Sequence, residues 1–234
     1  MATEFDKYVN DYKDIINRVS GASGERYEFF IELRTGLMKS RLKATTLDLA
    51  HLKILDVGCG IGVTEYFIQC NFPDAEITGV DNSEESIAAA NSLHLRNSRF
   101  VVSSSTNLPF EDGWFDLIYS NGTMHHIPHE QHPGVLGEMY RVLKPGGSIF
   151  LFENNPFNPL MMRAMRQNPF DADAKVVYPG RLAETAKAAR FGINGVYYYF
   201  FYPHMLQFLR WTEKYLSWLP LGAQYFLWGY KPKG

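Results

Sequence analysis

Cysteine is scarce in this sequence, and neither sign of charge is in excess. Its 234 residues include 2 cysteines, Cys59 and Cys70, and 23 Lys and Arg residues against 25 Asp and Glu residues give a formal net charge of −2. Two cysteines without CxxC spacing are too few for a disulfide scaffold, which favours a reducing compartment. Dedicated nucleic-acid binders are usually strongly basic. We therefore expect a cytoplasmic protein with no nucleic-acid partner.

Long hydrophobic runs are missing as well. The first ten residues hold acidic side chains and no apolar core, so no signal peptide is expected. The longest uncharged stretch, residues 191–209, is interrupted by glycine and proline. It falls short of the roughly 20 predominantly apolar residues that a membrane-spanning helix needs. The sequence therefore predicts no transmembrane segment.

Short apolar runs alternate with helical patterns through the middle of the chain. The pattern predicts strands at 53–57, 77–80, 100–102, 115–119 and 148–152. It predicts helices over 64–70, from Ser83 as N-cap, and over 135–143. Later elements are expected as helices at 160–166, 182–190 and 204–219 and strands at 195–202 and 223–230. The alternation favours an α/β fold with a doubly wound, mostly parallel sheet, whose ligands bind at the carboxyl ends of the strands.

A glycine-rich turn follows the first strand. Gly58, Gly60 and Gly62 stand at alternate positions, so the backbone can turn tightly and approach a ligand closely. The same turn is also compatible with a strand-to-helix connection that binds nothing. Asp81 ends the next strand, where a carboxylate can accept both hydroxyls of a ribose. A dinucleotide-binding GxGxxG pattern needs glycine at position 63, which is Val63 here, so a dehydrogenase is disfavoured.

Four motifs in order resemble those of the class I S-adenosylmethionine-dependent methyltransferases, most closely the ubiquinone- and menaquinone-type group. They are LDVGCGIG at 55–62, Asp81, NLPFEDGWFDLI at 107–118 and YRVLKPGG at 140–147. The resemblance covers about residues 5–152. It implies a Rossmann-like sheet of seven strands, with the last strand antiparallel between the fifth and the sixth. It also implies S-adenosyl-L-methionine as cofactor and a small-molecule acceptor.

The resemblance further implies one methyltransferase domain over residues 1–234. Residues 1–50 would form an N-terminal helical cap, residues 51–153 the cofactor-binding core, and residues 154–234 an acceptor-side elaboration with the final hairpin. The residues that it places around the cofactor are Asp56, Gly58, Cys59, Gly60, Gly62, Asp81, Asn82, Ser104, Ser105, Ser120, Asn121 and Gly122. Among them Ser104 departs from the family, since many relatives have an acidic residue there that accepts from the adenine amino group. A hydroxyl accepts more weakly, so we expect weaker cofactor binding than with aspartate.

Histidines cluster just after the fourth predicted strand. His125 is the candidate for a general base, because it follows a strand end that faces the cofactor and histidine titrates near neutrality. An ordinary packing role is the alternative. Four histidines between residues 125 and 132 also raise the question of a metal site. Because Pro128 and Pro133 interrupt helical spacing and no cysteine joins the group, no metal is expected.

Several further residues are candidates for contact with an acceptor. Glu153 and Asn155 leave the fifth strand on the same edge of the sheet, although Asn and Pro also form turns unaided. His126 follows His125, and Tyr12 lies one helical turn from Tyr8, where the pair either closes over the cofactor or simply packs.

Aromatic residues are concentrated at the end of the chain, where residues 191–234 hold 15 of the 35. The helix expected at 204–219 has one narrow polar stripe, which predicts that most of its surface is covered. The cover would be the same domain, a lid over an apolar acceptor, a second copy of the chain or a membrane surface, with contact through residues 196–219. The sequence thus predicts a methyltransferase for a small, partly apolar or glycan-linked acceptor. The alternative is a non-catalytic module that binds S-adenosylmethionine or S-adenosylhomocysteine.

Overall fold

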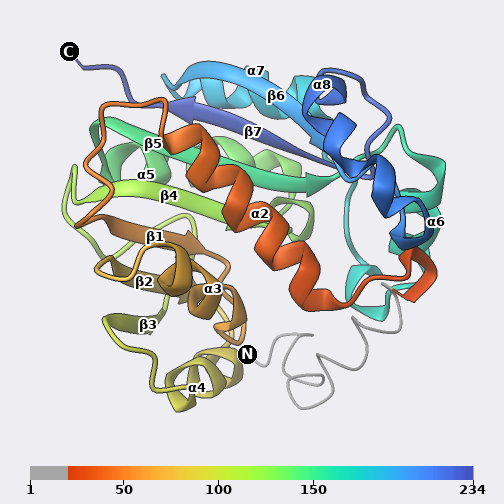
Figure 1. The fold of residues 1–234 in the computed structure, drawn as a ribbon. Coiled ribbons are helices and arrows are strands. Elements are labelled where there is room, and N and C mark those ends of the chain that lie inside the picture. Colours follow the sequence, from red (N-terminus) through yellow and green to blue (C-terminus); the bar gives the residue numbers. More distant parts are fainter. Residues whose placement is uncertain (1–20, 234) are drawn as a thin grey trace.

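A seven-stranded sheet forms the centre of the molecule (Figure 1). The computed structural model describes residues 21–233. The strands are β1 (Lys53–Val57), β2 (Glu76–Asp81), β3 (Ser98–Val102), β4 (Phe115–Asn121), β5 (Leu143–Asn154), β6 (Gly192–Tyr199) and β7 (Gln224–Tyr230). They lie in the order β3-β2-β1-β4-β5-β7-β6, with β1 to β5 parallel and β7 antiparallel to both of its neighbours. This confirms the expected doubly wound sheet and the place of its last strand.

Helices cover both faces of this sheet (Figure 1). The α-helices are α2 (Tyr27–Leu42), α3 (Val63–Asn71), α4 (Glu84–Ser92), α5 (His132–Val142), α6 (Pro159–Gln167), α7 (Pro179–Ala188) and α8 (Glu213–Leu216). The 3-10 helices are η2 (Gly21–Ser23), η3 (Met124–His126), η4 (His129–Gln131), η5 (Pro169–Asp171) and η6 (His204–Thr212). One apolar core lies under α2 and α3, and another lies under α5 and α7.

Local sequence signals account for the elements near the glycine turn. Ile54, Leu55 and Val57 of β1 are buried without alternation, as expected of a parallel strand covered on both faces. Ser83 caps α4 as predicted, since its hydroxyl oxygen accepts from the backbone N–H of Ser86 at 3.0 Å. The parallel order places the carboxyl ends of β1, β2 and β4 at one edge of the sheet.

The prediction of one long helix at 204–219 is wrong, because the segment forms two shorter helices of different types. The chain makes η6, with a non-helical Leu206, followed by the single turn of α8. The strand before it ends at Tyr199, because Phe200 adopts a positive φ of 59° and packs its buried ring against Phe29 and Phe30 of α2. The aromatic run therefore turns inward before η6 begins.

Within the described chain, the rest of the domain does not cover that segment, while a lid, a second copy or a membrane surface stays a prediction. Its large apolar side chains are exposed, among them Phe208 at 68%, Trp211 at 67% and Trp218 at 71%. The buried aromatics of the C-terminal part lie instead on β6 and β7, where Tyr199, Tyr225 and Phe226 join the cores. Within residues 21–233, no helix is long and apolar enough to cross a membrane.

Candidate active site

The glycine turn between β1 and α3 is tied to the end of β2. The backbone N–H groups of Gly58 and Cys59 donate to the carbonyl of Val80 at 2.8 and 3.0 Å. Gly58, Gly60 and Gly62 have φ values of 85°, 52° and 76°, the left-handed region that favours glycine. A Cβ on Gly58 would lie 2.2 Å from Thr123 Oγ1, whereas one on Gly60 would meet open space. The turn thus leaves a free approach over Gly60.

Asp81 fixes the turn from the end of β2. One carboxylate oxygen accepts from the Gly60 N–H at 2.9 Å, and the other accepts from the Ser83 N–H at 3.0 Å. Each oxygen can accept a further hydrogen bond. Asp81 therefore joins the glycine turn to the start of α4 while it borders the adjoining cavity.

Three buried acidic groups lie behind the turn. They are the carboxyls of Asp56 and Glu65 and the hydroxyl of Tyr119, and each of these residues is at most 1% exposed. Burial, with the nearby charge of Asp81 added, raises the pKa of Asp56 to about 7. Burial and the charge of Asp56 raise the pKa of Glu65 well above its usual range. Asp56 Oδ1 forms no hydrogen bond within the described chain although the residue borders the cavity, so it fits a cationic ligand such as an ammonium group.

One cavity of about 960 Å³ runs from the glycine turn past η3 to α6, η5 and α2. The predicted cofactor residues that line it are Asp56, Gly58, Cys59, Gly60, Asp81, Asn82, Ser104, Ser105, Asn121 and Gly122. His125 and His126 line its continuation. The cofactor side and the acceptor side predicted from the sequence are therefore parts of one space.

Some of the predicted site residues lie away from the cavity wall. Gly62 faces Ala90 and Phe100, which a Cβ there would contact. Ser120 is buried and donates to the carbonyl of Val57 at 2.9 Å, which links β4 to β1. The amide of the fully buried Asn155 donates to the carbonyls of Pro220 and Gly222 at 3.1 and 2.7 Å. Asn155 thus belongs to a turn, and Tyr12 lies outside the described residues.

Ser104 borders the cavity with its hydroxyl already engaged. Its Oγ lies 2.8 Å from Thr106 Oγ1, and the backbone N–H of Thr106 is 3.3 Å from it. The side chain nevertheless remains exposed beside Ser103 and Ser105. A hydroxyl at this position has less capacity to accept from an adenine amino group than a carboxylate would have.

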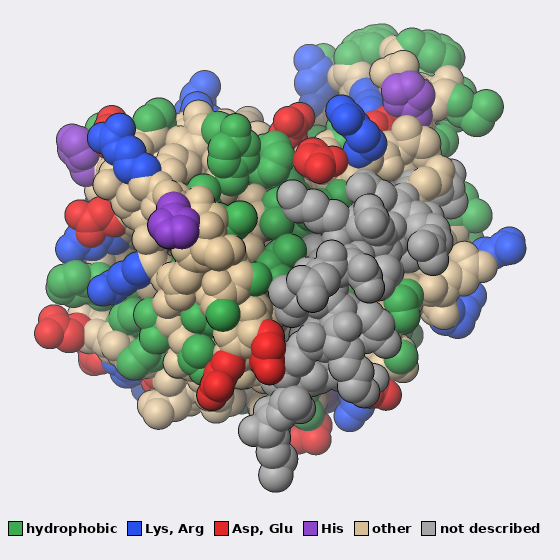
Figure 2. All heavy atoms as spheres, turned by 90° about the horizontal axis from the view of Figure 1, so that it is seen from below, with side chains coloured by type: hydrophobic (Ala, Val, Ile, Leu, Met, Phe, Trp, Pro, Cys, Tyr) green, Lys and Arg blue, Asp and Glu red, His purple; other side chains and the backbone are tan. Residues whose placement is uncertain are grey.

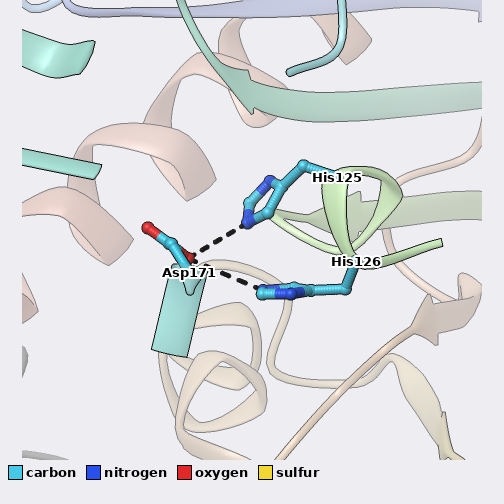
Figure 3. A group of neighbouring side chains, drawn as sticks. All are labelled: His125, His126 and Asp171. Atoms are coloured by element: carbon cyan, nitrogen blue, oxygen red, sulfur yellow. Dashed lines mark ion pairs between the residues drawn. The ribbon is translucent and has the colours of Figure 1, made fainter. Parts of the chain in front are cut away.

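His125, His126 and Asp171 meet on the acceptor side of the cavity (Figure 3), and Glu153 contacts His125 from behind. His125 Nδ1 lies 2.6 Å from Glu153 Oε2, and the other Glu153 oxygen accepts from the Met124 N–H at 2.9 Å. Glu153 therefore stands behind His125 and does not line the cavity. Asp171 Oδ1 lies 3.4 Å from His125 Nε2 and 3.7 Å from His126 Nε2.

These carboxylates change the ionisation of the two rings. Burial by itself lowers the pKa of His125, but the charges and hydrogen bonds of Glu153 and Asp171 outweigh it and raise that pKa to about 10. Burial and the charge of His125 lower the pKa of His126 to about 4. A protonated imidazole cannot accept a proton, so this arrangement argues against the general-base role expected of His125.

Sequence reasoning missed the residues that complete the acceptor side. Arg34 of α2 donates to the Tyr199 hydroxyl at 3.1 Å and to Gln224 Oε1 at 3.0 Å, and it lines the cavity. No ion pair to Arg34 is present among residues 21–233. Apolar side chains from several elements line the same wall: Ile127, Met161, Met165, Phe170 and Phe200. None of them falls in a motif, so only the fold reveals them.

Charges of both signs are interspersed on the face shown in Figure 2. The described part of this face carries Lys, Arg, Asp and Glu side chains without a continuous basic surface. That distribution agrees with the formal net charge of −2.

Part of the sequence is similar to known methyltransferases. Residues 54–147 match the family described as "Methyltransferase domain". The chain is 34% identical over 133 residues to sterol 24-C-methyltransferase erg-4 of Neurospora crassa, covering 55% of this chain and 31% of that one. It is 33% identical over 141 residues to the malonyl-[acyl-carrier protein] O-methyltransferase of Pectobacterium atrosepticum, covering 60% and 53%. The chain thus spans about a third to a half of the length of these relatives.

A solved structure shares the whole fold. The [4+2]-cyclase SpnF superposes with a TM-score of 0.69 at 18% identity, covering 100% of this chain and 98% of that one. At this identity the likeness shows the fold alone. The match of residues 54–147 includes the glycine turn, Asp81 and the strand that leads to the histidines.

Proposed function

Because residues 54–147 match the methyltransferase-domain family, we propose that the chain transfers a methyl group from S-adenosylmethionine to a small, partly apolar acceptor. The observation that carries the proposal is the single cavity of about 960 Å³, which joins the glycine turn to an apolar wall on α6, η5 and Phe200. Pockets of this size enclose most of a small ligand. Donor and acceptor would therefore share one enclosed space.

The chain's own residues account for binding and orienting the cofactor. The open space over Gly60 would let the cofactor approach the backbone of the turn closely. Asp56 Oδ1, which has no hydrogen-bond partner in the described chain, would accept from the ammonium group of the cofactor. The carboxylate of Asp81 borders the cavity and would accept from two ribose hydroxyls, and Ser104 and Ser105, which also border the cavity, would face the adenine. S-adenosylmethionine supplies an electrophilic methyl group on its sulfonium. Since in-line transfer depends on alignment and exclusion of water, the fixed turn and the enclosing wall are the main protein contributions.

The acceptor side favours a molecule with an apolar body and a polar or anionic group. Met161, Met165 and Phe170 offer apolar contacts, and the guanidinium of Arg34 faces the same cavity without an acidic partner in the described chain. An anionic group would therefore be bound there by charge-assisted hydrogen bonds. A sterol and a malonyl-carrier ester, which the names of two relatives indicate, each have part of this character. A glycan-linked acceptor is the other form of this proposal.

A non-catalytic module that binds S-adenosylmethionine or S-adenosylhomocysteine is the second candidate. The raised pKa of His125, which would keep the ring protonated, favours it. A base is dispensable for acceptors that are already nucleophilic, so methyl transfer remains the first candidate.

Two measurements test these two candidate functions. The first is calorimetric titration with S-adenosylmethionine, and the second is release of S-adenosylhomocysteine in the presence of a partly apolar or a glycan-linked acceptor. We expect one cofactor per chain, loss of binding in Asp81→Ala, and unchanged binding in Asp74→Ala, an exposed acid outside the cavity. Binding without turnover on any acceptor would favour the module. Absence of binding would overturn both.

The exposed apolar side chains on η6 and α8 support a further contact within residues 196–219. Met205, Phe208 and Trp211 project from the segment that follows the cavity residues Phe200 and Pro203. Apolar surfaces of this kind mark protein or membrane contacts. Molecular mass in solution and sedimentation with lipid vesicles would distinguish a homodimer from peripheral membrane contact, and a monomer that binds no vesicle would exclude both.

A further inference from the structure

We propose that His125, His126 and Asp171 bind a divalent transition-metal ion of the zinc class on the acceptor side of the cavity (Figure 3). The three side chains come from η3 and η5, which lie far apart in the sequence, and they point toward one another. The site is separate from the glycine turn and from the residues assigned to the cofactor.

Distances between the candidate ligand atoms suit such an ion. Asp171 Oδ1 is 3.4 Å from His125 Nε2 and 3.7 Å from His126 Nε2, and all three atoms lie within 4.8 Å of one another. Ligands about 2.1 Å from a tetrahedral zinc ion are separated by about 3.4 Å. The 3.4 Å separation is long for the hydrogen bond between Asp171 and His125, and the 3.7 Å separation exceeds the usual range of about 2.7–3.2 Å. One central ion would bind all three atoms once the two histidine nitrogens, which lie within 4.8 Å of each other, move closer together.

Neighbouring side chains orient two of the ligands. Glu153 Oε2 lies 2.6 Å from His125 Nδ1, so the proton on Nδ1 stays in this hydrogen bond while a metal ion displaces the proton on Nε2. Asn168 Nδ2 donates to Asp171 Oδ2 at 2.9 Å, which leaves Oδ1 directed at the histidines. Metal-ligating histidines usually donate their second ring N–H to a carboxylate or carbonyl, and ligating carboxylates are themselves hydrogen-bonded. The cluster has this arrangement on both sides.

The donor set also selects the kind of ion. Two imidazoles and one carboxylate suit zinc and neighbouring transition metals, whereas magnesium and calcium prefer oxygen ligands throughout. The carboxylates of Asp171 and Glu153 balance a divalent charge in a site that is largely buried. Three protein ligands leave a coordination position open, as in catalytic zinc sites. Because all three line the cavity, an oxygen of the acceptor would take that position, a step that rests on the proposed methyl transfer.

Zinc titration of metal-stripped, full-length protein tests the site without any cofactor. The measurement uses a Cys70→Ser background, because Cys70 is an exposed free thiol that itself attracts zinc. We expect one zinc ion per chain with micromolar or tighter affinity, not displaced by excess magnesium. Asp171→Asn and His126→Ala should each weaken binding by at least about tenfold. His94→Ala, an exposed histidine outside the cluster, should bind as the background does.

Cobalt supplies a second readout that reports the site itself. Its visible absorption depends on coordination by the protein, so the band should appear on titration and be absent in Asp171→Asn, whose side chain keeps the native shape. Thermal unfolding of each variant in chelator verifies that it is folded. Binding of zinc by Asp171→Asn as tightly as by the background protein, or no zinc binding at all, would overturn the site.

Failure of the metal site and failure of the proposed function are distinguishable. The same metal-stripped preparation is titrated with S-adenosylmethionine. Cofactor binding without zinc binding would overturn the metal site alone. Zinc binding without cofactor binding would overturn the methyltransferase proposal alone, and the metal site would stand.

Discussion

Asp56 shows at the scale of one residue why we infer a cationic ligand at this site. Its carboxyl is buried, has one oxygen without a partner in the described chain, and shares its surroundings with Glu65, Tyr119 and Asp81. Burial of an ionisable group without a counter-ion costs stability, so such a group is more readily explained by a ligand than by folding. The motif around Asp56 indicated its role, but its ionisation depends on neighbours from α3 and β4 that the motif does not contain.

Replacing Asp56 should affect stability and binding in opposite directions. Because the folded-state pKa of about 7 lies above the ordinary value of 3.8, the protonated form stabilises the fold. That stabilisation is complete below about pH 4 and is lost as the pH rises through about 7. Asp56→Asn should therefore melt at a higher temperature than the wild type at pH 8, with a smaller difference at pH 5, and should lose affinity for S-adenosylmethionine.

Thermal unfolding at the two pH values and calorimetric titration measure both effects. Asp74→Asn is the matched control, since Asp74 is exposed and lies outside the cavity. An Asp56→Asn protein that melts below the wild type at pH 8, or that binds the cofactor as well, would contradict this account of the residue.

A substitution at Ser104 should increase the affinity for S-adenosylmethionine. A carboxylate at this position would accept from the adenine amino group more strongly than the hydroxyl, which already contacts Thr106. Ser104→Asp should bind S-adenosylmethionine more tightly, by up to about tenfold, which corresponds to about 1.4 kcal/mol. Titration of both proteins at the same ionic strength measures the change, and equal or weaker binding by the variant would refute the expectation.

The glycines of the glycine turn have different surroundings, so the same substitution should have different effects. Gly58→Ala should destabilise the fold by more than about 1 kcal/mol, because φ is 85° and the new Cβ would lie 2.2 Å from Thr123 Oγ1. Gly60→Ala places its Cβ in open space beside the cavity, so its main effect should be weaker cofactor binding.

Gly180→Ala in α7 is the control for both, since nothing lies within 4 Å of its added Cβ and its φ is not positive. It should stabilise the protein by about 0.4–1 kcal/mol. Denaturant unfolding and cofactor titration separate the two effects. Similar stability of Gly58→Ala and Gly180→Ala would show that the turn tolerates a side chain.

The η6–α8 segment contributes side chains to the surface and little to the core. Phe208 is 68% exposed, so Phe208→Ala should change the free energy of unfolding by no more than about 0.5 kcal/mol. Phe226 of β7 is buried among Phe150, Phe152 and Tyr197, so Phe226→Ala should cost about 3–5 kcal/mol. Chemical denaturation compares the two, and a large loss in Phe208→Ala would mean that its ring is covered in solution.

Prediction from the sequence worked best where the information is local. The glycine turn, the Ser83 cap and the alternation of strands and helices each depend on neighbouring residues, and the structure confirms them. The helix predicted at 204–219 was wrong, because a periodic stripe does not specify what packs against it and Leu206 departs from helical geometry. Asp171 and Arg34 could not be found, since they join the site through η5 and α2 without a motif.

At the scale of the whole molecule, the parallel part of the sheet and the segments around the final hairpin contribute different walls of one cavity. The carboxyl ends of β1, β2 and β4 carry the residues assigned to the cofactor, while α2, α6, η5 and the residue after β6 supply the other wall of the cavity. This arrangement explains why methyltransferase motifs are confined to the middle of the chain. The division into residues 1–50, 51–153 and 154–234 stays a prediction.

Calorimetric titration of the full chain with S-adenosylmethionine, with NAD as the comparison ligand, tests the central claim most directly. The account predicts one S-adenosylmethionine per chain, no binding of NAD, and loss of the S-adenosylmethionine signal in Asp81→Ala but not in Asp74→Ala. Absence of S-adenosylmethionine binding by the wild-type chain, or equal binding by Asp81→Ala, would contradict it.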